Sequence, residues 1–341
     1  MRKILWIAFL VYFFVPAITI AQQKTKGKGK DNKKEAELIC GKALDYLRGN
    51  NGVPIDTAKA IVLFKEAAEK GDSFAQCELG YFYDTGKGVY KDYRQAVYWY
   101  RKAAEQGYDL AQNFLGTKYS AGKGVEKDYK QAVYWYRKAA EQGEAVAQFH
   151  LGDCFYFGDG VPKDYEQAVY WYHKSAEQGC KFAQYSLGRC FQAGEGVQTD
   201  YSQAVFWFHK AAEQGEAGAQ FYLGVFYYDG IRGVQQDLKQ AVYWYRKAAE
   251  QGLANAQNNL GLCYERGYGV SKDYTQAVFW YKKAIDGGSD IALSNLGLCY
   301  YEGNGVKKDL DMAKRLFIES ARLDCQEAKN NLKNLFGIES Y

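Results

Sequence analysis

A segment repeated about every 36 residues restricts the fold of this chain more than any other feature. Its clearest copy is DYKQAVYWYRKAAEQG, residues 128–143. Aligned on the tryptophan, the copies are spaced by 36, 36, 36, 37 and 36 residues, at Trp99, Trp135, Trp171, Trp207, Trp244 and Trp280. Leu63 and Leu316 take this position in two weaker copies. A period of about 20 to 50 residues indicates a solenoid, in which each unit contacts mainly its neighbours.

The first half of each repeat has the pattern of a helix. In residues 108–143, Ala111, Leu115 and Tyr119 recur every four residues and mark an apolar stripe. Gly116 lies beside this stripe, and Gly122 suits a C-terminal cap. A mid-helix glycine costs about 0.5 to 1 kcal/mol relative to alanine, so its recurrence predicts close helix packing. These packing glycines are Gly80, Gly116, Gly152, Gly188, Gly224, Gly261 and Gly297.

The second half predicts another helix. Asp128 is the expected N-cap, and Gln131 three residues later completes a capping-box pattern that returns in the other copies. Trp135 and Tyr136 belong to the expected packing face, and Gly143 ends the segment. Only three prolines occur, which favours helices. The sequence therefore predicts an all-α fold, an α-solenoid of helix-turn-helix repeats.

The repeats define the domain organisation. Eight helix pairs are expected over residues 36–324, the first of them degenerate, and a capping helix over residues 325–341. In that last helix Ala328, Leu332 and Phe336 continue the apolar stripe, whereas Lys333 replaces the packing glycine. This replacement is expected where no further repeat follows.

The N-terminal segment predicts export. Arg2 and Lys3 precede an apolar run that is interrupted by Pro16 and ends near Ala21, so residues 1–21 are interpreted as a cleaved secretory signal peptide. An uncleaved membrane anchor is the alternative. Residues 22–35 are rich in lysine and glycine and are interpreted as a basic, flexible linker. The expected location is secreted or periplasmic, with no membrane span in the mature chain.

Charge argues against nucleic acid as a partner. Residues 1–34 hold eight Lys or Arg and one acidic residue, and residues 35–341 hold 36 basic and 39 acidic residues. A nucleic-acid-binding domain needs a basic stripe of its own.

The repeat pattern AQxxLGxxYxxGxGVxxDYxQAVxWYxKAAEQG resembles the Sel-one-like repeat family, or SLR, a relative of the tetratricopeptide (TPR) solenoids. The resemblance extends from about residue 40 to 336. It implies a right-handed superhelix with a concave inner surface that serves as an adaptor for other proteins. Family members occur in bacterial envelopes and in eukaryotic secretory compartments.

The sequence predicts no catalytic residues, no metal site and no cofactor. Loops such as Gly86–Val89 return in every repeat as turns and lack the context of a phosphate-binding loop. His173 and His209 replace Arg or Lys at a position interpreted as solvent-facing. The only S-x-x-K, Ser120 to Lys123, lies at a helix C-terminus, without the N-terminal position and base that activate a serine.

The cysteines are predicted to be mostly buried thiols. Cys154, Cys190, Cys263 and Cys299 are equivalent residues of first helices. Neighbouring equivalents would lie about 8 to 10 Å apart, too far for a disulfide. A cysteine-rich SLR branch has a regular disulfide within each repeat and is linked to β-lactam binding or hydrolysis. This sequence lacks that regular pair.

A partner is expected where the repeats differ. Three positions of the first helix vary: three residues before, one after and four after the packing glycine. In the central repeats they concentrate aromatic residues, at Phe149, Tyr156, Tyr185, Phe221 and Tyr228. Aromatic side chains contribute much of the energy at protein interfaces, so these five are the predicted binding residues for a protein or peptide. Two alternatives stay open: packing between first helices, or a groove for cell-wall glycan or a β-lactam.

Overall fold

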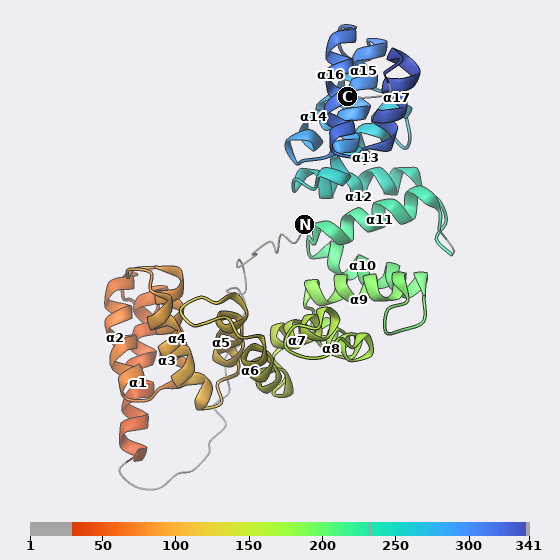
Figure 1. Cartoon of the computed structure of the whole chain (residues 1–341). Helices are drawn as coiled ribbons and strands as arrows, with labels where there is room; N and C mark the ends of the chain where they lie inside the picture. Colours follow the sequence, from red (N-terminus) through yellow and green to blue (C-terminus); the bar gives the residue numbers. More distant parts are fainter. Residues whose placement is uncertain (1–28, 232, 339–341) are drawn as a thin grey trace. The chain divides into compact units, whose positions relative to one another are not determined.

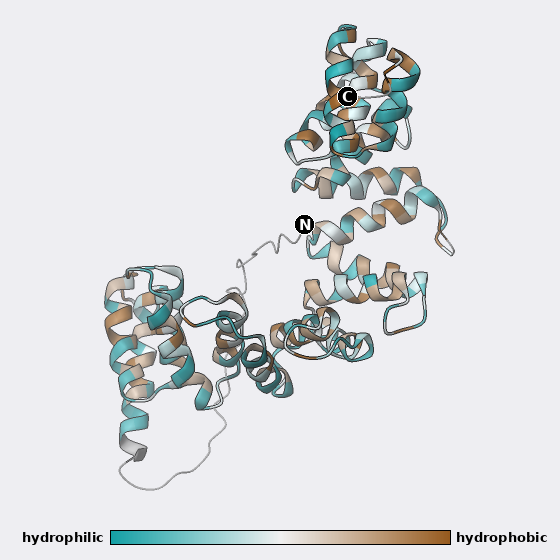
Figure 2. Cartoon of the chain, in the orientation of Figure 1, coloured by the Kyte–Doolittle hydropathy of each residue, from teal (hydrophilic) through white to brown (hydrophobic). Residues whose placement is uncertain are grey.

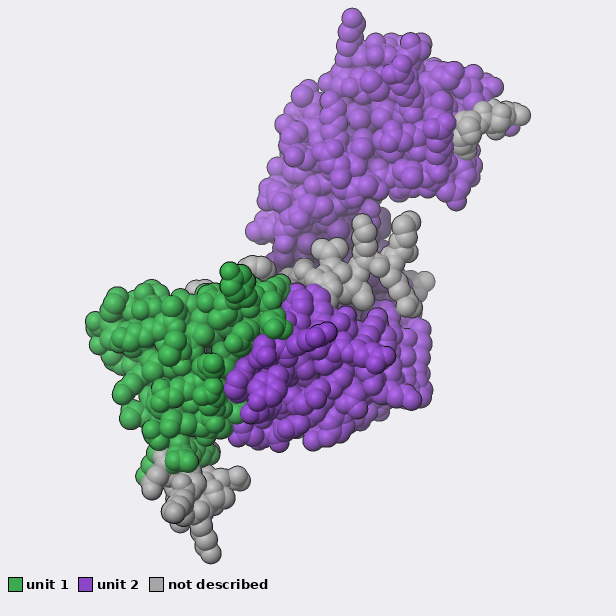
Figure 3. All heavy atoms as spheres, turned by 60° about the vertical axis from the view of Figure 1, so that its left-hand side comes forward, with its two compact units in different colours: residues 1–92 green, residues 93–341 purple. Residues whose placement is uncertain are grey.

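The computed structural model describes residues 29–231 and 233–338, which form seventeen helices and no strand (Figure 1). Contacts between Cα atoms divide the chain into two units, residues 1–92 and 93–341 (Figure 3). The predicted all-α class is confirmed, with consecutive helices paired along the chain. The signal-peptide interpretation of residues 1–21 lies outside the described residues.

The described part of the first unit contains α1 (Gly29–Arg48), α2 (Thr57–Glu69) and α3 (Ser73–Thr85). The linker prediction for residues 22–35 is wrong from residue 29 onward, because α1 begins there. Lys, Glu and Ala dominate residues 33–38, and these are strong helix formers. Ala36 is buried in this helix, which ties its polar first turns to the packed part of the unit.

The second unit alternates the first and second helices of the repeats. It begins with the second helix α4 (Tyr93–Glu105). The first helices are α5 (Asp109–Ala121), α7 (Ala145–Phe157), α9 (Lys181–Ala193), α11 (Ala217–Asp229), α13 (Ala254–Arg266) and α15 (Asp290–Glu302). The second helices that follow them are α6 (Tyr129–Glu141), α8 (Tyr165–Glu177), α10 (Tyr201–Glu213), α12 (Leu238–Glu250), α14 (Tyr274–Asp286) and α16 (Leu310–Arg322).

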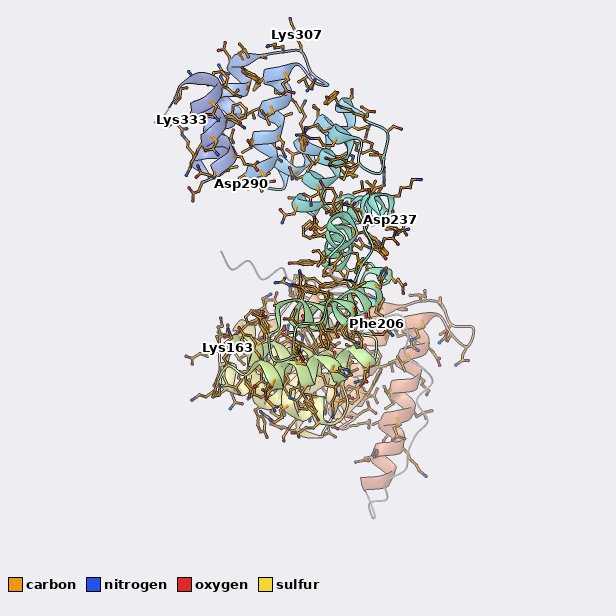
Figure 4. All side chains as sticks on the ribbon, turned by 90° about the vertical axis from the view of Figure 1, so that its right-hand side faces the viewer. Lys163, Phe206, Asp237, Asp290, Lys307 and Lys333 are labelled. Carbon is orange, nitrogen blue, oxygen red and sulfur yellow. The ribbon has the colours of Figure 1, made fainter. Side chains whose placement is uncertain are left out.

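The predicted caps at Asp128 and Gly122 are confirmed, but the N–H of Asp128 donates to the carbonyl of Tyr119 at 3.0 Å and not to Gln131, so the predicted capping box is wrong there. Asp128 has extended backbone angles, and its carboxylate accepts a hydrogen bond from the backbone N–H of Gln131 at 3.0 Å. Asp237, labelled in Figure 4, caps α12 in the same way. Gly122 ends α5 in the left-handed conformation, with φ 66°. From α6 to α16 each second helix therefore begins at an aspartate that satisfies one or two of its first backbone donors.

The packing glycines admit an aromatic ring of the second helix. A Cβ atom built on Gly116 would lie 2.7 Å from the ring of Tyr136, and one on Gly152 would lie 2.6 Å from the ring of Tyr172. Such separations are shorter than van der Waals contact. The predicted close approach is confirmed, and the ring lies against helix backbone rather than against a side chain.

A chain of glutamine hydrogen bonds joins successive repeats. Gln112 donates from Nε2 to the carbonyl of Ala104 at 3.1 Å, and its Oε1 accepts from Gln142 Nε2 at 2.8 Å. The same side-chain pair forms between Gln148 and Gln178, Gln184 and Gln214, and Gln220 and Gln251. The pattern AAEQG, in which the second helix ends, thus supplies a glutamine that bonds to the first helix of its own repeat and a carbonyl that accepts from the repeat after it.

Alanine, leucine and aromatic side chains fill the interior of each unit. Hydrophobic and polar residues alternate along the helices in Figure 2, and every repeat of the second unit contributes fully buried alanines. In the last helix, α17 (Gln326–Phe336), Ala328 and Leu332 are buried and Lys333 is exposed, labelled in Figure 4. No helix within residues 29–231 or 233–338 is long and apolar enough to cross a membrane.

Candidate partner-binding surface

The five predicted binding residues lie on three successive first helices, α7, α9 and α11, and all are partly buried. Each packs against the aromatic residue that follows the tryptophan of its own repeat. Phe149 and Tyr156 have ring centroids 6.0 and 6.4 Å from that of Tyr172. The second-helix ring that packs against the glycine therefore also contacts the variable aromatic residues of the first helix.

The other three residues repeat this arrangement. Tyr185 lies 6.0 Å from Phe208, and Phe221 and Tyr228 lie 6.1 and 6.4 Å from Tyr245, between ring centroids. The structure thus places the five residues in three groups, one per repeat, on one series of helices. We call the exposed side of α7, α9 and α11 that carries them the first-helix face.

Further aromatic side chains connect these groups, and the sequence interpretation missed them. Phe182 lies 6.0 Å from Phe149, and Tyr222 lies 6.1 Å from Tyr185 and 5.5 Å from Phe221, between ring centroids. Tyr222 precedes its packing glycine by two residues, a position that also varies among repeats. This variation was the signal that could have identified Tyr222.

Polar groups on this face are paired within the protein. Tyr156 Oη donates to Glu195 at 2.6 Å, and Tyr172 Oη donates to Asp153 at 2.7 Å. Burial raises the pKa of Asp153 to about 7, although the Tyr172 hydroxyl acts against this rise. Burial also lowers the pKa of His150 to about 4, so this imidazole is neutral near pH 7.

The S-x-x-K residues do not form a nucleophilic site. Ser120 lies in the last turn of α5, where its hydroxyl donates to the carbonyl of Thr117 at 3.1 Å and lies 3.3 Å from Tyr136 Oη. The ammonium group of Lys123 lies 5.3 Å from the centre of the Tyr93 ring. The serine is thus occupied by a helix carbonyl and a tyrosine, neither of which acts as a base near pH 7.

Four equivalent cysteines are buried thiols, as predicted: Cys154, Cys190, Cys263 and Cys299. Burial is the main cause that raises the pKa of each to about 12. They are protonated near pH 7 and behave as small apolar residues of the core. Cys180 is partly exposed.

The interpretation of the histidine position as solvent-facing is wrong for His209. Its side chain is partly buried, and Nε2 lies 3.0 Å from Tyr227 Oη of the next first helix. Arg246, at the equivalent position, donates to Tyr264 Oη at 2.7 Å. His173 is exposed and lies 3.5 Å from Glu177. No group of three or more potential metal ligands occurs in the part of the chain that the structure describes.

Comparison with known proteins identifies the repeats. The model of the Sel1 repeat matches eight consecutive segments, residues 35–72, 73–108, 109–144, 145–180, 181–216, 217–253, 254–289 and 290–325. The chain belongs to the Sel1 repeat family. The match confirms the recognised resemblance and the count of eight repeats. A search of curated proteins finds no match.

Two solved Sel1-type structures resemble the chain over most of its length. A Sel1 repeat protein from Oxalobacter formigenes is 29% identical, with 94% of this chain and 98% of that chain covered and a TM-score of 0.64. The protein c5321, described as a protective antigen of uropathogenic Escherichia coli with an SLR fold, is 32% identical. That match covers 89% of this chain and 80% of that chain, with a TM-score of 0.50. Sel1-repeat proteins are generally scaffolds for protein interaction, and most are not enzymes.

Proposed function

We propose that this Sel1 repeat protein is a non-enzymatic scaffold that binds a protein or peptide on its first-helix face. The observation that carries the proposal is the clustering of partly buried aromatic residues at variable positions of α7, α9 and α11. These residues pack on rings that are positioned by the packing glycines, so the surface has its shape before a partner binds. Preorganised aromatic side chains are effective interface residues because little conformational freedom is lost on binding.

We place this scaffold in a secreted or periplasmic compartment. The support is the sequence of residues 1–21, in which a basic start, an apolar run and a small residue at Ala21 are typical of a cleaved signal peptide. The partner is accordingly expected in the cell envelope or outside the cell.

The proposal is tested by capture of partners from envelope extract on the immobilised full-length protein. The test variant changes Phe149, Tyr185 and Phe221 to alanine. The matched control changes Tyr134, Tyr170 and Phe206 to alanine. These residues are 47%, 48% and 49% exposed and lie on second helices. Phe206 is labelled in Figure 4. We expect the test variant to lose the captured protein and the control to retain it.

Equal capture by the two triple variants would refute the assignment of this face. A matching thermal unfolding profile for both variants is required, so that loss of capture reports the surface rather than the fold. Turnover of a chromogenic β-lactam that disappears in Ser120→Ala would instead support the alternative, a protein that binds or hydrolyses cell-wall compounds.

A further inference from the structure

A small pocket opens beside the C-terminal end of the first-helix face. It has a volume of about 190 Å³ and lies between α11, α12 and α13. Its lining consists of Val225, Tyr228, Asp229, Tyr245, Asn259 and Leu262. The walls are therefore aromatic and aliphatic, with one carboxylate and one amide. Tyr228 belongs both to this pocket and to the first-helix face, which makes the two continuous.

The repeat before this pocket shows what such a position can hold. Arg189 occupies the position of Val225 in that repeat, one residue after the packing glycine. Its guanidinium lies 5.0 Å from the centre of the Tyr222 ring, and Nη1 donates to Tyr185 Oη at 3.3 Å. The protein's own arginine thus occupies the aromatic surface between α9 and α11. Val225 is too short to do the same between α11 and α13, and the pocket is found there.

The repeat after the pocket also satisfies its charges internally. Glu265 accepts a hydrogen bond from Tyr281 Oη at 2.7 Å and lies 3.2 Å from the guanidinium of Arg266. Asp229 differs from Arg189 and Glu265, the charged residues described in the two neighbouring repeats. It is exposed at the end of α11, and no basic side chain forms an ion pair with it within residues 29–231 and 233–338.

The carboxylate of Asp229 acts on the aromatic walls. Burial is the main cause that raises the pKa of Tyr228 and Tyr245, and the negative charge of Asp229 contributes to the rise of both. Arg266 acts in the opposite direction on Tyr228, but its charge is balanced by Glu265. Tyr228, Tyr245 and Asp229 line the same pocket, so a cation bound there would meet two aromatic side chains and one carboxylate.

We propose that this pocket binds an arginine side chain of the protein or peptide partner, an inference that rests on the proposed function. The guanidinium would stack on Tyr228, as that of Arg189 does on Tyr222, and pair with Asp229. An arginine fits better than a lysine because its planar group combines stacking on a ring with a two-point contact to a carboxylate. Its aliphatic stem matches Val225 and Leu262.

The test uses N-acetyl-arginine amide as the probe and saturation-transfer NMR on the full-length protein. The uncharged analogue N-acetyl-citrulline amide has nearly the same shape and serves as the ligand control. Val225→Arg should place the protein's own guanidinium in the pocket, following the arrangement at Arg189. Asp229→Asn removes the charge without changing the size of the side chain. Glu213→Gln removes an exposed carboxylate from the end of α10 and is the matched control.

We expect saturation transfer to the side-chain methylene protons of the arginine probe and much less transfer to the citrulline probe. Affinity should fall by roughly tenfold or more in Asp229→Asn, as is usual for loss of a charged hydrogen-bond partner. It should fall at least as far in Val225→Arg and stay unchanged in Glu213→Gln. Equal binding of both probes, or full binding to Val225→Arg, would overturn the inference.

The two proposals can fail separately. If the aromatic triple variant loses its captured partner while Asp229→Asn retains full affinity for the arginine probe, the scaffold function stands and the arginine pocket is wrong. If the arginine probe binds as expected but the triple variant captures partners normally, the pocket stands and the first-helix face does not bind the partner.

Discussion

The first and second helices of each repeat in the second unit differ in how their sequences change along the chain. From α4 to α14 the second helices keep nearly the same residues, and each has a defined structural task, such as the cap at Asp128 and the ring of Tyr136 on Gly116. The first helices keep only the residues that meet the second helix, and their remaining positions vary. Invariance in this chain therefore marks architecture, whereas variation marks the surface available for recognition.

The packing glycine gives the sharpest test of this difference, because it is an invariant residue within the variable helix. At Gly224 a Cβ atom would lie 2.4 Å from the ring of Tyr245. We expect Gly224→Ala to lower the free energy of unfolding by about 1–3 kcal/mol, since either ring or helix must move. Denaturant unfolding followed by circular dichroism measures this.

The control is Gly41→Ala in α1, where an added Cβ atom meets nothing within 4 Å. There the substitution should stabilise the protein by about 0.5–1 kcal/mol, because only helix propensity changes. If Gly224→Ala were also stabilising, the close approach would not be the reason for the recurring glycine.

The second largest effect is expected at the N-caps of the second helices. Asp164→Ala removes the acceptor for the backbone N–H of Gln167, which is 3.0 Å away, and should lower the free energy of unfolding by about 1 kcal/mol. Asp128→Ala and Asp200→Ala should give losses that equal each other within error, since each of these carboxylates accepts from two backbone N–H groups. Clearly unequal losses would show that the second helices are not equivalent. Lys163→Ala, at the exposed residue before the cap (Figure 4), is the near-neutral control.

The fold could be predicted from the sequence because its determinants recur. Asp128, Gly116 and Tyr136 return at one period, so their roles were read from several copies of the same pattern. The first-helix face could be predicted only in part. Tyr222 was missed because only three variable positions were considered, and the solvent-facing interpretation of His209 failed because a contact with Tyr227 depends on how successive repeats pack. The start of α1 was missed because a lysine-rich composition alone does not separate a linker from an exposed helical turn.

The pocket at Tyr228 could not be predicted from the sequence. It depends on the space that the short side chain of Val225 leaves between helices of neighbouring repeats. No sequence pattern predicts such a space. The glutamine contacts illustrate the same limit. Their residues recur visibly, but the pairing of Gln142 with a residue 30 positions earlier follows only from how the two helices of a repeat pack.

The glutamine chain offers a third test, because it links the two kinds of helix across a repeat boundary. Gln178→Ala would leave Gln148 Oε1 buried without its donor at 2.8 Å, and we expect a loss of about 1 kcal/mol in the free energy of unfolding. The protein contains one natural precedent. Gly287 stands where the glutamine follows each second helix from α4 to α12, and Gln257 Oε1 is buried there without a hydrogen-bond partner. Amide hydrogen exchange should therefore be faster at the α14–α15 boundary than at α8–α9, and Gln178→Ala should make the two alike.

The smallest expected effect concerns Asp153, a variable residue of the first helix. It accepts a hydrogen bond from the hydroxyl of Tyr172 in the second helix. Because its pKa in the folded state is raised to about 7, the folded protein binds its proton more tightly than the unfolded chain does. Ionisation of Asp153 should therefore reduce stability as the pH rises from about 4 to about 7. His150 has the opposite influence, since its pKa is lowered to about 4 and stability increases as the unfolded imidazole loses its proton. Comparing Asp153→Asn with the unchanged protein isolates the effect of Asp153, because both proteins contain His150. Over this pH range the unfolding temperature of the unchanged protein should fall relative to that of the variant, whereas a constant difference would show that the Tyr172 hydroxyl keeps Asp153 ionised.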